Sequence, residues 1–210
     1  MKKIRSKRDA ESAIELALKM HTMVHFKSML PNSQIETFWD DIWSGLTDEQ
    51  LAVMPSRKDN TIAWCLWHIT RIEDIVSNLL INQGSPIFDE QWKVALNINI
   101  SDTGNAMKDS EMIAFSQQIN KNELVKYSNT VGHQTQEIIR SLTAEKLKQR
   151  PTLESLERIV EHGGLIQHRN SIWLKDFWGK KTIAGLVLLP LTHHHVMHMN
   201  EAVSMRERIL

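Results

Sequence analysis

Apolar residues along the chain recur every three or four positions, and few windows alternate strictly between apolar and polar residues. This period is typical of amphipathic α-helices. Only eight glycines and five prolines interrupt the 210 residues, which also favours helices. We expect helices over residues 10–30, 33–44, 48–53, 61–83 and 120–142, one or two shorter ones over 152–177 with a break near Gly163–Gly164, and a last helix after Pro190 whose first turn Thr192 could cap.

The segment between residues 85 and 120 is less regular than the rest of the chain. It begins beside Gly84 and Pro86, which end the helix predicted over 61–83, and it contains the polar stretch 97–105, which is typical of a loop. A connection this long is unusual in a helical bundle. We therefore expect a crossover that covers one mouth of the bundle.

The last predicted helix carries four histidines within six positions, His193, His194, His195 and His198. Residues four apart lie about 40° apart around a helix, one turn above the other, so His194 and His198 can share a metal ion. Apolar positions before and after them fall on the same side, which directs both rings toward the core. His195 lies at the margin of that stripe and His193 in the polar arc.

A third ligand is needed, because zinc and similar ions normally bind three or four protein side chains. His68 is the best candidate, since it occupies the middle of the apolar stripe of the 61–83 helix. Glu73 and Asp74 lie away from that stripe, and we expect them to be solvated. His21 and His25, also four residues apart, remain an alternative ligand pair, because apolar residues surround their helix and its inner face cannot be assigned cleanly.

Three segments of the chain resemble the DinB-like superfamily. They are 64–74 (WCLWHITRIED), 173–179 (WLKDFWG) and 190–202 (PLTHHHVMHMNEA). The resemblance implies an all-α fold, an up-up-down-down four-helix bundle, here with extra short helices and the long crossover. It also implies one divalent metal ion on three histidines, one from the second long helix and two from the last, which correspond to His68, His194 and His198.

Composition bounds the class of protein. A chain of 210 residues can bury a substantial core, and we expect a single domain over residues 1–210. The 25 basic and 25 acidic residues balance, so there is no global electrostatic reason to bind nucleic acid or an anionic membrane. No apolar run reaches the roughly 20 residues that span a bilayer, and no signal core follows the basic start. We therefore expect a cytoplasmic protein.

The chain has a single cysteine, Cys65, which suits a reducing compartment. Cys65 precedes His68 by three residues, so a role as ligand or nucleophile must be weighed. Its neighbours in sequence are apolar and offer no base. We interpret it as a small buried hydrophobic residue.

Glu201 lies three residues after His198 on the same helix face. It could orient a ligand, occupy a fourth coordination position or act as a base toward water, and an ordinary ion pair at the bundle edge is the alternative. Three imidazoles leave an open position, as in catalytic zinc sites. All-imidazole sites suit zinc, nickel, iron or copper, and we expect zinc or nickel.

These features together predict a metal-dependent enzyme of the transferase or hydrolase type that acts on a small molecule, with Glu201 as its catalytic residue. The resembled superfamily includes thiol-dependent transferases and isomerases. The alternative is a non-catalytic metal-binding stress-response protein whose ion only ties helices together. Seven tryptophans and ten methionines further predict a homodimer, with a face that includes Trp39 and Trp43.

Overall fold

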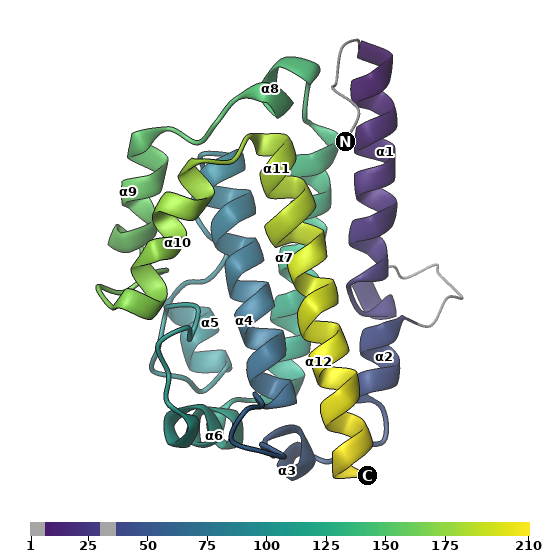
Figure 1. Ribbon diagram of the computed structural model, residues 1–210, viewed down its shortest axis with the longest axis vertical. Helices are drawn as coiled ribbons and strands as arrows, with labels where there is room; N and C mark the ends of the chain where they lie inside the picture. Colours follow the sequence, from purple (N-terminus) through teal and green to yellow (C-terminus); the bar gives the residue numbers. More distant parts are fainter. Residues whose placement is uncertain (1–6, 30–36) are drawn as a thin grey trace.

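Four long helical segments form the bundle in the computed structural model, which describes residues 7–29 and 37–210 (Figure 1). They are α1 (Lys7–Met23), α4 (Ile62–Asp74) with its π-helical continuation η2 (Ile75–Ile81), α7 (Lys121–Arg140), and α11 (Ile183–Leu188), which continues through the π-helical η3 (Leu189–His193) into α12 (His194–Ile209). Short helices surround them: η1 (Lys27–Met29), α2 (Phe38–Trp43), α3 (Asp48–Leu51), α5 (Glu90–Ala95), α6 (Asp109–Gln118), α8 (Ala144–Lys148), α9 (Leu153–Glu161) and α10 (Arg169–Gly179). The described ranges contain no strand, and the predicted all-α bundle with extra short helices is confirmed.

Two of the predicted helix starts carry side-chain caps. The Thr61 side chain accepts a hydrogen bond from the Trp64 backbone nitrogen, and the Asn120 side chain accepts one from the Glu123 nitrogen. Each cap satisfies a backbone donor that has no partner inside the helix. The second long helix ends where the chain turns through Gln83, whose φ is 60°. Part of the helix predicted over 33–44 lies outside the described residues, and its end is α2.

The last long helix begins earlier than predicted. Its cap is Thr182, whose side chain accepts from the Gly185 nitrogen, and the helical path runs through Pro190 without a break. Thr192 lies inside this path and donates its hydroxyl hydrogen to the Leu188 carbonyl at 2.6 Å, so it is not a cap. A π-helical turn explains the continuity, because its wider backbone can accommodate a residue that donates no hydrogen bond.

The order of helix directions differs from the predicted up-up-down-down arrangement. Hydrogen bonds join Thr22 to Gln136 and Ser28 to Asn129. A later residue on the α1 side thus pairs with an earlier residue of α7, so the two segments are antiparallel. Helices α1 and α12 run parallel, whereas α4 runs opposite to both, and α7 runs with α4 (Figure 1). The order is therefore up-down-down-up. The link between α1 and α4 stays at one end of the bundle, and only the parallel pair α4 and α7 needs a long return connection.

That return connection is the predicted crossover. Residues 82–120 leave the end of η2 and come back to the start of α7 along one side of the bundle, carrying α5 and α6 on the way (Figure 1). The stretch 97–105 forms no helix, as expected. The return path lies against α4, because Trp67 Nε1 donates to the Asp102 carbonyl at 3.2 Å.

Helix α4 occupies the centre of the fold. Every residue from Ile62 to Ile81 is buried, including polar ones, because α7, α12 and the crossover cover different sides of this helix. Trp39 is also buried, at 1% exposure, and Trp43 packs partly buried beside it in the same hydrophobic cluster. Of the two, Trp39 is therefore part of the core of one chain, whereas Trp43 keeps an exposed part, and the homodimer stays a prediction. Within the described residues, no helix has the length and apolar character to cross a bilayer.

Candidate metal site

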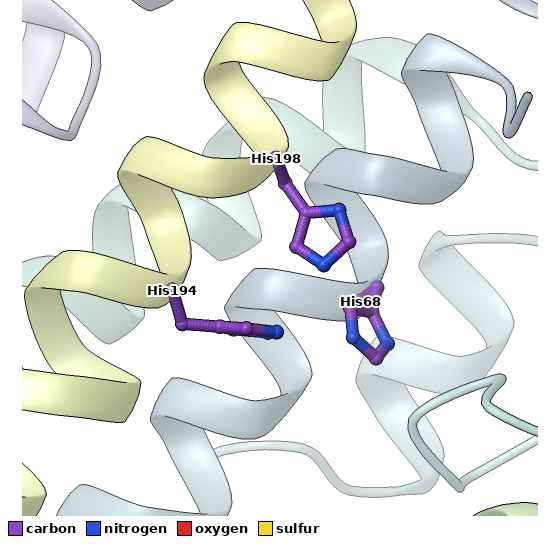
Figure 2. Close-up of side chains that lie close together, drawn as sticks. All are labelled: His68, His194 and His198. Carbon is purple, nitrogen blue, oxygen red and sulfur yellow. The ribbon is translucent and has the colours of Figure 1, made fainter.

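Three histidines from two antiparallel helices converge beside the centre of the bundle. His68 comes from the middle of α4, and His194 and His198 come from successive turns of α12 (Figure 2). Ring centroids lie 5.1 Å apart for His68 and His194, 4.9 Å for His68 and His198, and 4.7 Å for His194 and His198. One ligand nitrogen from each ring lies within 4.8 Å of the other two. The structure thus brings together the three histidines predicted from the sequence.

The outer nitrogens of two of these rings have hydrogen-bond partners. His68 Nδ1 lies 2.7 Å from the Thr103 carbonyl oxygen, and because a carbonyl can only accept, Nδ1 carries the hydrogen. His198 Nδ1 lies 2.8 Å from Glu201 Oε2, to which it donates. The lone pair of each ring is then on Nε2, where a metal ion could bind it. The donor set therefore fits a divalent transition metal.

Burial favours the neutral forms of His68 and His194. Desolvation lowers the pKa of His68 to about 3, and the neighbouring His198 lowers it further against the effect of the Thr103 carbonyl. Desolvation likewise lowers the pKa of His194, aided by His68. Trp64 stacks on the His68 ring with centroids 4.5 Å apart. Neutral imidazole is the form that binds metal, so these surroundings favour ligation.

The buried face of α12 is rotated relative to the predicted stripe. His195, expected at the margin, is only 1% exposed, whereas His194 and His198 are half-buried. Met199, Ala202 and Met205 share the buried face with His195. The π-helical turn of η3 explains the difference, because its wider turn shifts the angular position of every residue that follows it.

Two acidic residues expected to be solvated are completely buried. The Glu73 carboxylate lies within ion-pair distance of three imidazoles, those of His21, His25 and His195. Asp74 accepts hydrogen bonds from Arg71 Nη1 at 2.9 Å, Asn78 Nδ2 at 2.9 Å and the Tyr127 hydroxyl at 2.7 Å. The prediction failed because the side of α4 opposite His68 faces other helices instead of water.

Cys65 lies nearer to the site than its sequence neighbours suggested. Its sulfur is within 4.8 Å of a His198 nitrogen and a Glu201 oxygen, so the expectation that no base is near is wrong. The thiol is nevertheless fully buried, and burial together with the Glu201 charge raises its pKa well above the usual value. Cys65 is therefore a protonated thiol at neutral pH and a poor nucleophile.

An apolar pocket of about 220 Å³ opens onto two of the three histidines. His68 and His194 form one wall, and the other walls come from the crossover, α10 and the start of the last helix. Its remaining lining residues are Ile72, Asn105, Trp173, Leu174, Phe177, Trp178, Leu189, Pro190 and Met197. The pocket gives a small molecule a path to the histidines.

The chain belongs to the DinB superfamily, whose family model matches residues 35–202. Among solved structures, the chain is similar to one titled a conserved protein of locus from Enterococcus faecalis. The two share 14% sequence identity and a TM-score of 0.56, over 97% of this chain and 96% of that one, so the likeness concerns the fold. No curated protein matches the chain. Membership of this superfamily and the histidine cluster are both compatible with a metal-binding protein.

We predict that metal-free protein loses stability as the pH falls from about 6.5 toward 3. The pKa of His68 is about 3 in the folded chain and roughly 6.5 when unfolded, so only the unfolded chain binds this proton between the two values. The free energy of unfolding should fall by up to about 1.4 kcal/mol per pH unit for this group. Denaturant titrations in chelator at several pH values measure the slope.

The matched variants for this measurement are His68→Gln and His133→Gln. Glutamine at 68 removes the titrating group and should make the slope shallower, whereas His133 is exposed on α7 and its replacement should leave the slope unchanged. Equal slopes for wild type and His68→Gln would contradict the prediction.

Proposed function

We propose that the chain binds one divalent transition-metal ion, zinc or nickel, on His68, His194 and His198, and that it is a metal-dependent enzyme of the transferase or hydrolase type. The observation that carries the proposal is the hydrogen bonding of the outer nitrogens of His68 and His198, which leaves both Nε2 lone pairs available for an ion beside His194. Structural zinc sites use four protein ligands, whereas three ligands are typical of catalytic sites.

The pocket beside the histidines indicates the class of substrate. Its aromatic and aliphatic walls fit an apolar group, and Asn105 adds a polar side chain. A bound divalent ion would act there as a Lewis acid toward a thiolate, carbonyl or ester group. The proposed substrate is therefore a small molecule with an apolar part and one metal-binding group. Trp173, which lines this pocket, is 49% exposed.

Glu201 has a specific place in this proposal. Its carboxylate binds the outer nitrogen of His198, and Asn60 Nδ2 donates to the same oxygen at 3.1 Å. The hydrogen bond between His198 and Glu201 makes the His198 ring a stronger ligand and fixes its orientation. The carboxylate thus lies on the side of the His198 ring away from the proposed ion. This position favours a role in orienting the ligand His198 over the predicted role of Glu201 as a catalytic base.

The alternative function is non-catalytic metal binding, in which the ion only joins α4 to α12. The pocket favours the enzyme, because an ion that only ties two helices needs no path for a small molecule.

The first expected result concerns metal content. His68→Ala, His194→Ala and His198→Ala should each contain about one equivalent less zinc or nickel than wild type, because two remaining imidazoles bind weakly. Elemental analysis of purified, dialysed protein measures this. His193→Ala is the matched control, since His193 is exposed on the adjoining turn and should leave the content unchanged. Undiminished metal in all three ligand variants would exclude this site.

The second expected result concerns Glu201. Glu201→Gln should weaken metal affinity roughly 10- to 100-fold, the usual effect of removing a carboxylate behind a ligating imidazole. Competition with a coloured chelator measures the affinity. Glu207→Gln changes an exposed carboxylate on the same helix and should have no effect. If affinity is unchanged and turnover alone falls in Glu201→Gln, the catalytic role predicted from the sequence regains support.

The third expected result concerns catalysis. The metal-loaded protein should turn over thiol-transfer, ester or amide substrates that carry an apolar group, and the activity should disappear in chelator and in His198→Ala. Trp173→Ala should raise KM several-fold because it removes a wall of the pocket, whereas Val94→Ala, at an exposed site away from the pocket, should not. Activity that survives without metal would contradict the mechanism, and inactivity on every substrate class would favour the binding protein.

A further inference from the structure

A second cluster of metal-binding side chains lies inside the bundle, apart from the three-histidine site. His21 and His25 come from the end of α1 and the turn after it, Glu73 from α4 and His195 from α12. All four residues are buried, with exposures between 0% and 1%. His21 and His25 precede the segment matched by the family model, which begins at residue 35. The superfamily match therefore covers Glu73 and His195 but neither of the two histidines on the α1 side.

The inner atoms of this cluster are spaced like ligands of one ion. His21 Nε2 lies 2.7 Å from Glu73 Oε1, His25 Nε2 lies 3.1 Å from Glu73 Oε2, and the two Nε2 atoms lie 3.1 Å apart. In a tetrahedral zinc site with bonds of about 2.0–2.1 Å, neighbouring ligand atoms lie roughly 3.3 Å apart. A small outward shift of these three groups would therefore make room for an ion.

Hydrogen bonds alone do not satisfy this arrangement. If both Nε2 atoms carry hydrogens and donate to Glu73, two N–H groups oppose each other across 3.1 Å. If one of them lacks its hydrogen, its lone pair faces a carboxylate oxygen. Either assignment places two atoms of like partial charge in contact inside a dry core, where their repulsion costs free energy. A cation between them would make every one of these contacts attractive.

The charge of Glu73 leads to the same conclusion. A fully buried carboxylate needs positive charge nearby, and the ion-pair partners of Glu73 within the described ranges are the three imidazoles. A bound divalent cation would supply that positive charge.

Neighbouring residues hold the cluster in this geometry. The His25 ring packs directly on Gly132 of α7, where an added Cβ would lie 2.9 Å from its Cε1 and Nδ1 atoms. His195 Nε2 lies 3.0 Å from Glu73 Oε2, within ion-pair distance, so its ring borders the carboxylate on the α12 side. His195 is next in sequence to His194 of the first site.

From this geometry we propose a second, structural transition-metal site formed by His21, His25 and Glu73, with His195 bordering the carboxylate. Two imidazoles and a carboxylate suit zinc or a similar divalent ion. The ion would join α1 to α4, whereas the first site joins α4 to α12. Because the cluster is closed to solvent, its ion would stabilise the bundle, and neither its existence nor its test depends on enzymatic activity.

The experiment uses the full chain with the first site disabled by His198→Ala. After chelation and dialysis against excess Zn²⁺, elemental analysis should find one zinc per chain in this variant. Adding His25→Gln or Glu73→Gln should remove that zinc, whereas adding the exposed-site change His133→Gln should not. Thermal melts should show that Zn²⁺ raises the Tm of His198→Ala, with the shift lost in His198→Ala/Glu73→Gln.

Glu73→Gln preserves the shape of the side chain, and circular dichroism identifies any variant that fails to fold. If such a failure occurs, His198→Ala/Gly132→Ala crowds the His25 ring and the Met29 sulfur without changing a proposed ligand, and it should still lower zinc affinity at least 10-fold. Absence of bound zinc and of any Tm shift in folded His198→Ala would overturn the proposal and leave a metal-free hydrogen-bond network. The first site is measured independently in His25→Gln, so failure of one site is distinguishable from failure of the other.

Discussion

Complete burial of α4 is the constraint on which the rest of the structure depends. The helix has no face toward water, so its polar side chains depend on partners inside the protein. His68 faces α12 and the crossover, Glu73 faces α1 and α12, and Asp74 faces Arg71 and the hydroxyl of Tyr127. Both candidate metal sites therefore lie along one helix, and each joins it to a different neighbour.

The up-down-down-up order of the helices follows from the same arrangement. Because α4 and α7 are parallel neighbours, the chain must return the length of the bundle between them, and that return supplies Thr103 and Asn105 beside the three-histidine site. The carbonyl of Thr103 fixes the tautomer of His68. A connection that topology requires thus also completes the hydrogen bonding of a ligand and contributes to the wall of the pocket.

Sequence reasoning located the three-histidine cluster because its signal is local. His194 and His198 are related by one helical turn, a relation that depends only on helix geometry, and His68 lies within a clear apolar stripe. The same reasoning failed for Glu73 and Asp74, since a polar position on a helix indicates solvent only when the helix has an exposed side. It could not identify Thr103 either, because a backbone carbonyl leaves no mark in the sequence.

By itself the sequence determined the long helices in outline, the crossover and the histidine pairs on single helices. Only the tertiary structure decided which helix faces meet, that a π-helical turn rotates α12 and buries His195, and that His21 and His25 face Glu73. The physical reason is that helical periodicity defines angles within one helix. Contacts between helices depend on the packing of all of them together, which no single segment of the sequence encodes.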